Sequence, residues 1–299
     1  MKTNVDCLPC FLRQSLQVAR LCGCSAEKQL QIVKEIAGML PGIDNDNDPP
    51  ANVDAIYRKI AELTGVDDPY NAKKKESNEQ AKALLPELQN ELKGVDDELS
   101  AVIRFVIAGN IIDYGAFETF DIHRSLEKSR EAPLAVDHCS SLIKAISELK
   151  PKSTILYLTD NSGEIVYDSL LLSYLHRHGC TITIAVKDGP IINDALVEDA
   201  LFAGLDRFGT IITNGTRCPG TVIDRCSDEF LHEFKTADLI ISKGQGNFES
   251  LSEVDREIYF LLTIKCQVAA RHMEELVGLE EHSLPGTGEM AVYFSGKNK

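Results

Sequence analysis

Side chains suited to binding a metal ion and a phosphate follow directly on a short apolar run near the middle of the chain. Asp160 and Asn161 come just after residues 154–158, and Glu164 opens a helical pattern. Carboxylate and amide oxygens are ligands for hard divalent cations, and a helix N-terminus attracts anions. Ligands of open α/β sheets bind beyond the carboxyl ends of the strands. The spacing therefore predicts metal-assisted phosphoryl chemistry at this strand end.

Three further polar clusters follow apolar runs in the second half of the chain. The runs are 181–186, 209–213 and 239–242, and the clusters that follow them are 187–194, 214–220 and 243–249. One such cluster is weak evidence, because turns favour the same residue types. Parallel strands, however, bring their carboxyl ends to one edge of a sheet. We therefore expect all four clusters to converge on a single site.

Provisional roles follow from the chemistry of the side chains. Asp160 and Asp194 are the candidate anionic metal ligands and Asn161 a neutral one. A cation held this way polarises a phosphoryl oxygen and lowers the pKa of a bound water. The nucleophile is either that water or Asp160 itself. Lys243, a compact positive charge, is the second candidate catalytic residue. The candidate substrate- or phosphate-binding residues are Asn193, Lys243, Gly244, Gly246, Asn247 and Glu164.

Each of these residues also has an ordinary structural explanation. Asp160 and Asp194 could be N-caps of the helical patterns that begin near Gly163 and Ala195. Lys243 alone resembles a solvated surface lysine, and a Gly-x-Gly sequence is usually a turn. The expected convergence of four clusters favours a functional site over these alternatives.

Helical spacing dominates the first half of the chain, and short β-rich runs alternate with helices in the second. Helices are predicted over 11–21, 26–40, 53–63, 71–85 (ending before Pro86), 96–107 and 137–149. Strands are predicted over 154–158, 181–186, 209–213, 239–242 and 259–264, with an edge strand over 291–294. Such alternation predicts an α/β fold with a mainly parallel sheet covered on both faces. We place the boundary near 150, giving a helical region 1–150 and an α/β domain 151–299.

The amino-acid composition and the net charge argue against some classes of binding partner. The chain has 299 residues and a formal net charge of −15, with 46 acidic against 31 basic residues. This balance opposes binding to nucleic acid or to anionic membranes. No apolar run approaches the roughly 18–20 residues of a membrane span, and residues 1–7 lack the apolar core of a signal peptide. A cytoplasmic location is the expectation.

Four of the nine cysteines lie close to the N-terminus, as Cys7-x-x-Cys10 and Cys22-x-Cys24. An odd number of cysteines in such a chain favours free thiols over a disulfide framework. Three interpretations stay open for Cys7 and Cys10: buried thiols, ligands of zinc or another second metal, or a redox pair.

At these residues the chain resembles the metal-dependent damage-control phosphatases, the family known as domain of unknown function 89. The Asp160-Asn161 turn, the Asn193-Asp194 pair and the segments 243–247 and 109–113 resemble its recurrent motifs. Cys7-x-x-Cys10 is similar to the N-terminal motif of a microbial subgroup. The resemblance runs through nearly the whole chain in the expected order.

The resemblance implies a helical N-terminal region packed on a three-layer α/β/α sandwich. It also implies hydrolysis of phosphate esters of small metabolites, such as sugar phosphates or damaged phosphometabolites, with manganese, cobalt, nickel or magnesium as the cation. One eukaryotic branch has been credited with carboxyl methyl transfer.

Two alternatives to a phosphatase remain, a non-catalytic metal- and metabolite-binding protein and a carboxyl methyltransferase. The first predicted strand has no Gly-x-Gly-x-x-Gly turn after it, so dinucleotide-type cofactors gain no support. The expected partner is a small phosphorylated metabolite, and the sequence does not determine the oligomeric state.

Overall fold

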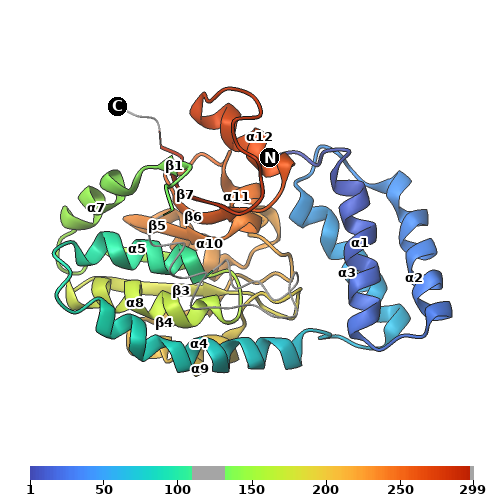
Figure 1. The fold of residues 1–299 in the computed structure, drawn as a ribbon, viewed down its shortest axis with the longest axis horizontal. Helices are drawn as coiled ribbons and strands as arrows, with labels where there is room; N and C mark the ends of the chain where they lie inside the picture. The colour runs from blue at the N-terminus through green and yellow to red at the C-terminus, as the bar shows by residue number, and fades with distance from the viewer. Residues whose placement is uncertain (110–131, 297–299) are drawn as a thin grey trace.

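A mainly parallel seven-stranded sheet forms the centre of the protein (Figure 1). The computed structural model describes residues 1–109 and 132–296. The sheet order is β1-β7-β6-β5-β2-β3-β4, and only β6 and β7 pair antiparallel. The strands are β1 (Val136–Asp137), β2 (Thr154–Leu158), β3 (Thr181–Val186), β4 (Thr210–Thr213), β5 (Leu239–Lys243), β6 (Tyr259–Ile264) and β7 (Glu289–Phe294).

Helices cover both faces of the sheet, which confirms the predicted three layers. Successive residues of a strand point to opposite faces: Ile155 and Tyr157 enter one hydrophobic core, Leu156 and Leu158 the other. The first core is completed by α4 (Asn71–Glu91), α5 (Glu98–Ala108), α7 (Cys139–Ser147), α8 (Glu164–Arg177) and α9 (Val197–Phe202). The second is completed by α10 (Asp228–Thr236), α11 (Gln245–Leu251) and α12 (Gln267–Val277).

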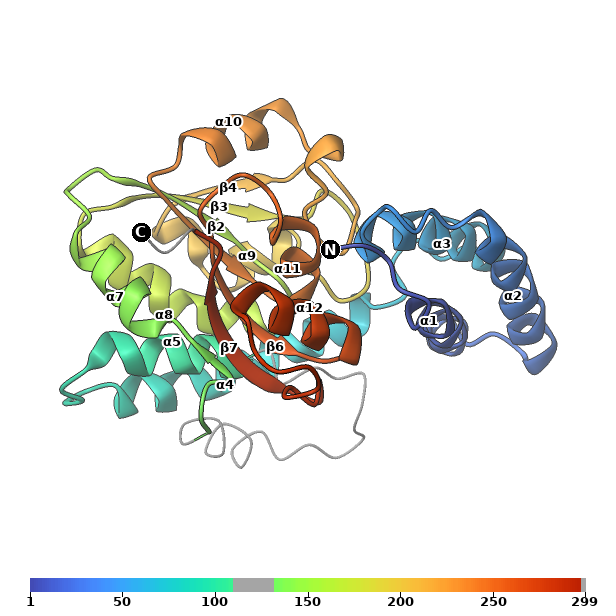
Figure 2. The ribbon, with the colours of Figure 1, turned by 90° about the horizontal axis from the view of Figure 1, so that it is seen from above.

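Three N-terminal helices form a separate group at one end of the sheet (Figure 2). They are α1 (Cys7–Leu21), α2 (Ala26–Met39) and α3 (Pro49–Thr64), and they share their own apolar core. Ile192 and Val268 of the α/β part pack against that core. Helices α4, α5 and α7, which precede residue 150, instead join the core of the sheet. The domain boundary near residue 150 stays a prediction.

Two details of the predicted elements were wrong. The predicted helix end before Pro86 is missing, because α4 continues through this proline to Glu91. An internal proline costs about 3 kcal/mol. Leu88 beyond it is 3% exposed, and its burial in the first core helps to offset that cost. The strand predicted at the sheet edge, β7, lies between β6 and β1. The edge strand β1 has only two residues, too few to show an alternating pattern.

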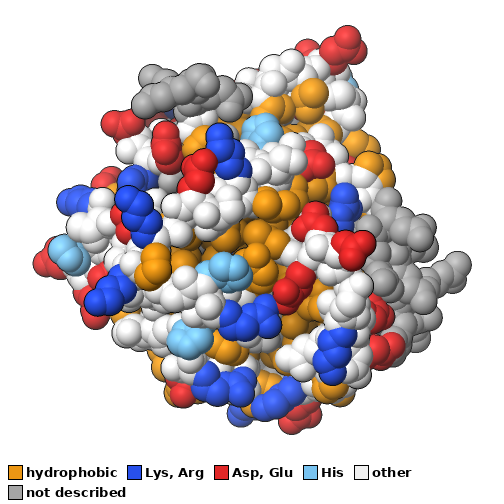
Figure 3. Space-filling view, turned by 90° about the vertical axis from the view of Figure 1, so that its left-hand side faces the viewer, with side chains coloured by type: hydrophobic (Ala, Val, Ile, Leu, Met, Phe, Trp, Pro, Cys, Tyr) orange, Lys and Arg blue, Asp and Glu red, His pale blue; other side chains and the backbone are white. Residues whose placement is uncertain are grey.

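The face of the molecule away from α1–α3 carries positive and negative side chains around a central group of hydrophobic ones (Figure 3). In the described part of the chain, every helix is too short or too polar to cross a bilayer.

Candidate active site

The order of the strands reverses beside β2, and the candidate residues gather there. From β2 the chain passes through α8 to β3 on one side, whereas β5 pairs with β2 on the other. The helices α8 and α10, which precede β3 and β5, lie on opposite faces of the sheet. Such a switch point leaves a crevice at the carboxyl ends of the strands, where ligands of α/β proteins bind. Asp160 follows β2 and Gly244 follows β5, so both lie at this point.

Backbone pairing joins the Asp160 turn to the segment that follows β3. Asn161 and Asp194 form an isolated antiparallel bridge. The Ser162 amide donates to the Asn193 carbonyl at 2.9 Å, and the Ala195 amide donates to the Asp160 carbonyl at 2.8 Å. The Asn161 side-chain amide donates to the Asp160 carboxylate at 2.7 Å. The three predicted metal ligands are therefore brought together, although Asp194 lies more than thirty residues after Asn161 in the sequence.

Gly244 lies against the Asp160 carboxylate. A Cβ built on Gly244 would be 2.0 Å from Asp160 Cγ, and the φ of Gly244 is +82°. Only glycine combines such a backbone with such a close approach. The turn after β5 therefore fixes where the Asp160 carboxylate lies.

Lys187 and Asn247 connect the turns that follow β2, β3, β4 and β5. Lys187 Nζ donates to the Gly220 carbonyl at 2.8 Å and lies 3.6 Å from Asp194 Oδ2. The Asn247 side-chain amide donates to the carbonyls of Thr159, at 3.1 Å, and Lys243. These contacts, all between buried groups, make the carboxyl edge one hydrogen-bonded unit.

The Lys243 ammonium is fully buried and has three acceptors. It donates to Glu164, to Asp168 Oδ1 at 2.8 Å and to the Val106 carbonyl at 3.0 Å. The Tyr157 hydroxyl also donates to Asp168 Oδ1, at 2.7 Å. Burial lowers the pKa of Lys243, but the two carboxylates outweigh burial and raise that pKa above its usual value. The lysine is therefore held as an ammonium ion.

Buried acids outnumber buried bases at this edge. Four carboxylates are at most 8% exposed and two ammonium groups at most 4%, namely Asp160, Glu164, Asp168 and Asp194 against Lys187 and Lys243. Burial, followed by the Glu164 and Asp194 carboxylates, raises the pKa of Asp160 well above its ordinary value. Burial likewise raises the pKa of Asp168 to about 6, against the opposing effect of the Lys243 ammonium. An additional positive charge would therefore be electrostatically favourable at this edge.

Comparison with known proteins agrees with this geometry. A family model for the damage-control phosphatase ARMT1-like domain matches residues 3–279. The chain belongs to this family. The match includes every predicted metal and phosphate ligand, so the family resemblance predicted from the motifs is confirmed.

Two relatives that are named damage-control phosphatases align with almost the whole chain. A damage-control phosphatase of Pyrococcus horikoshii is 36% identical over 278 residues, covering 92% of this chain and 95% of that protein. A damage-control phosphatase of Archaeoglobus fulgidus is 33% identical, covering 93% and 97%. A crystal structure of a DUF89 family protein from Pyrococcus horikoshii matches with a TM-score of 0.86 and 31% identity, covering 99% of this chain and all of that one. This structural match confirms the fold class.

The ordinary structural explanations for the candidate residues do not hold. Gly163, not Asp160, is the N-cap residue of α8, and Leu196, not Asp194, precedes α9. Lys243 is 0% exposed, so it is not a solvated surface lysine. In the Gly-x-Gly segment, a Cβ on Gly246 would meet the Pro219 carbonyl oxygen at 1.9 Å, which shows close packing of two strand-end segments rather than a free turn.

Some residues at the candidate site were not assigned a role from the sequence. Lys187 directly follows a buried strand, and Asp168 lies one helical turn after Glu164; both signals are present in the sequence. Asn78 of α4 had no such signal. Its side chain accepts from the Gly163 amide at 2.6 Å and donates to Asp199 at 2.6 Å. Helix α4 therefore helps to fix the turn after Asp160.

The contacts of Lys243, Asn247 and Glu164 with substrate stay predictions. In this structure Lys243 donates to Glu164, and Asn247 donates to the Lys243 carbonyl. Glu164 also accepts from the Asn161 side chain. These bonds within the protein favour positioning roles. Of the motif at 109–113, only Gly109 is described; it ends α5, and a Cβ there would meet Tyr167 at 2.7 Å. Residues 110–113 lie outside the described part of the chain.

The N-terminal cysteines have free thiols. Cys7 is buried, Cys10 is partly buried, and Cys10 Sγ accepts from the Gln14 amide at 3.7 Å. Burial raises the pKa of Cys7 to about 11, which opposes thiolate chemistry. Within residues 1–109 and 132–296, no three His, Cys, Asp or Glu side chains are grouped as a metal site. A cation bound between Asp160 and Asp194 would accordingly need Asn161, water or another molecule as further ligands.

Proposed function

We propose that the protein is a divalent-cation-dependent phosphatase that hydrolyses phosphate esters of small, damaged metabolites. Membership of the damage-control phosphatase family and the names of two relatives support a phosphatase. The observation that carries the cation dependence is the excess of buried carboxylates around the carboxyl ends of the paired strands β2 and β5.

The residues present fit a divalent cation in number and chemistry. If all six buried groups are ionised, the carboxyl edge carries two more negative than positive charges. Asp160, Asn161 and Asp194 supply oxygen donors of the kind that hard cations prefer. The backbone of Gly244 packs against the Asp160 carboxylate and restricts its position. When bound, manganese, cobalt, nickel or magnesium would supply the positive charge that polarises a phosphoryl oxygen.

The protein groups around that position would orient the phosphate. The Ser162 hydroxyl is buried and lacks a hydrogen-bond partner among the described residues, so it is available as a donor at the start of α8. Lys187 contributes a second buried ammonium beside Asp194. Lys243 forms an ion pair with Glu164 and so fixes the position of that carboxylate at the start of α8. Positioning and electrostatic stabilisation supply most of phosphoryl-transfer catalysis.

A screen for phosphate release tests the proposal. The wild-type protein is incubated with sugar, nucleotide and cofactor phosphates, with manganese, cobalt, nickel or magnesium, and in parallel with a chelator. We expect cation-dependent release from at least one small monoester. Stabilisation by ligands without any turnover would instead support the metabolite-binding alternative. Carboxyl methyl transfer is not favoured, because the two relatives that match more than nine-tenths of this chain and have an activity in their names are phosphatases.

A small phosphorylated metabolite in the cytoplasm is the proposed substrate. The acidic net charge of −15 supports neither nucleic acid nor an anionic membrane as a partner.

A further inference from the structure

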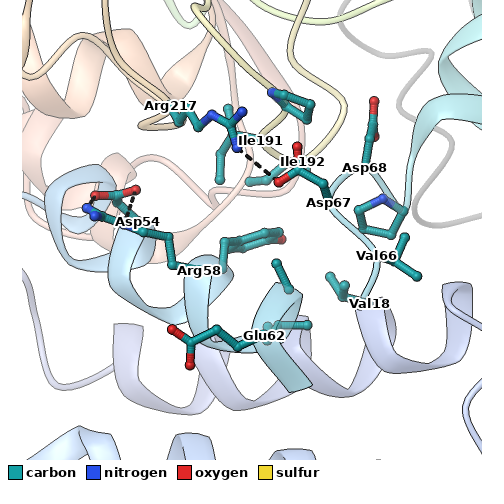
Figure 4. A pocket seen from close by; sticks show the side chains of 15 residues that line it. Val18, Asp54, Arg58, Glu62, Val66, Asp67, Asp68, Ile191, Ile192 and Arg217 are labelled. Atoms are coloured by element: carbon teal, nitrogen blue, oxygen red, sulfur yellow. Dashed lines mark hydrogen bonds and ion pairs between the residues drawn. The ribbon is translucent and has the colours of Figure 1, made fainter. Parts of the chain in front are cut away.

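A cavity lies between the N-terminal helices and the carboxyl edge of the sheet (Figure 4). Its volume is ≈ 270 Å³, enough for a small organic group. Helices α1 and α3 and residues 66–69 form one side. Residues 190–192 and Arg217, from segments that follow β3 and β4, form the other. The cavity is thus built from both parts of the chain.

The cavity adjoins the proposed metal ligands. Ile191 and Ile192 line it and are followed directly by Asn193 and Asp194. The Asp194 amide donates to the Ile191 carbonyl at 3.1 Å, so a tight turn connects the cavity wall to the ligand. Tyr57 of α3 lines the opposite wall of the cavity. A phosphate ester bound at Asp194 would therefore direct its alcohol part into this space.

Arg217 is held at the cavity wall by two contacts. Its guanidinium donates to Asp67 Oδ1 at 3.0 Å, which joins the two sides of the cavity (Figure 4). It also lies against the backbone of Gly189, where a Cβ would meet Arg217 Nε at 2.3 Å. The loop that carries Arg217 continues to Gly220, whose carbonyl binds Lys187 beside Asp194. Arg217 is thereby placed at a fixed point relative to the catalytic edge.

The lining is largely apolar, and its cations are already paired. Val18, Ile60, Ala61, Val66, Ile191 and Ile192 contribute apolar surface. The two guanidinium groups each face a carboxylate, Arg58 with Asp54 and Arg217 with Asp67. Among the described residues, no lining cation is left to neutralise a second anionic group. The chemistry favours an uncharged ligand with an apolar face.

We infer that this cavity binds the alcohol part of the substrate and selects small monophosphate esters whose alcohol is uncharged and has an apolar face. The inference rests on the proposed function and names the substrate class of that same site. Tyr57 and Arg217 are assigned as residues that determine specificity, because they line the cavity from its two opposite sides.

A series of alkyl phosphates tests the cavity apart from the chemistry. Methyl, ethyl, propyl and butyl phosphate have similar leaving groups and differ in the apolar length that can be buried. Each buried methylene contributes about fourfold to binding, so butyl phosphate should have a kcat/KM about 50-fold above that of methyl phosphate. Butanediol bisphosphate should lose this gain, because its second phosphate finds no unpaired cation.

Two variants of α3 locate the effect. Ala61→Phe places a ring in the cavity, whereas Ala55→Phe places the same ring on an exposed position of the same helix. In Ala61→Phe the preference for butyl over methyl phosphate should fall below about fivefold. Ala55→Phe should keep the wild-type preference.

Alkyl phosphonates of the same chain lengths, measured by calorimetry, separate this inference from the proposed function. If the wild type turns over esters but shows no length preference, or if Ala61→Phe and Ala55→Phe behave alike, the cavity is not the alcohol site and the phosphatase proposal stands. If no ester is turned over with any cation, the proposed function fails. In that case, stronger binding of butyl than methyl phosphonate in the wild type, lost only in Ala61→Phe, would still support the cavity, and equal binding would refute it.

Discussion

Gly244→Ala is a sharp test of the site because it removes no functional group. The new Cβ would be 2.0 Å from Asp160 Cγ, and real Cβ contacts are essentially never closer than 3.0 Å. The carboxylate must therefore retreat by about 1 Å, since the backbone of Gly244 is tied to β6 through its amide, which donates to the Leu261 carbonyl. Displacements of this size can reduce catalysis by about a hundredfold. We expect a loss of that order in both cation affinity and turnover.

A matched control separates displacement from backbone strain. Gly278 also has a positive φ, +71°, but a Cβ there meets nothing within 4 Å. Gly278→Ala should cost about 1–2 kcal/mol of stability and leave cation binding intact. Cation affinity is measured by calorimetry and turnover by phosphate release, with folding checked by denaturation in urea. If Gly244→Ala binds the cation as tightly as Gly278→Ala, the carboxylate of Asp160 is not a ligand.

Lys243, the N-terminal cysteine pair and His272 each give a separate testable expectation. Lys243→Ala should keep cation binding and lose turnover by about a hundredfold, because Glu164 would no longer be held in position. The same variant should lose about 3–5 kcal/mol of stability, because Glu164 and Asp168 would be left buried without a counter-ion. Lys243→Arg should recover part of the turnover, and wild-type kcat in Lys243→Ala would remove this lysine from the mechanism. Changing both Cys7 and Cys10 to Ser should spare turnover and affect only stability, since neither thiol lies at the strand ends; a large fall in kcat of a folded, cation-loaded double mutant would contradict this. Burial lowers the pKa of His272 to about 4, so the wild type should lose stability relative to His272→Gln as pH falls from 6.5 towards 4, by about 1.4 kcal/mol per pH unit, and a pH-independent difference in urea unfolding would refute that assignment.

The strands and the convergence of the polar clusters could be predicted because local and tertiary signals agree. β2, β3 and β6 begin and end where the apolar, β-branched runs do. Once these runs are strands of a parallel sheet, their carboxyl ends must meet, so the proximity of Asp160, Asn161 and Asp194 follows from topology.

Other features depend on tertiary contacts that the sequence does not encode locally. Pro86 normally ends a helix, but the apolar residues around it continue into the core of the sheet. The burial of Lys243 depends on Glu164, Asp168 and the end of α5, which come together only in the folded protein. Likewise, the contribution of Asn78 to the Asp160 turn spans 85 residues of sequence. Polar side chains that act at such distance carry no periodic signal.

The central claim is that a cation held by Asp160, Asn161 and Asp194 makes the carboxyl edge of the sheet a phosphatase site. It is tested most directly by phosphate release as a function of cation concentration, in the wild type and in Asp194→Asn, which keeps the shape of the side chain but removes its charge. The account predicts saturable activation of the wild type, none in chelator, and a requirement for at least about a hundredfold more cation in the variant. Full phosphate release in chelator, or the same cation dependence in both proteins, would contradict it.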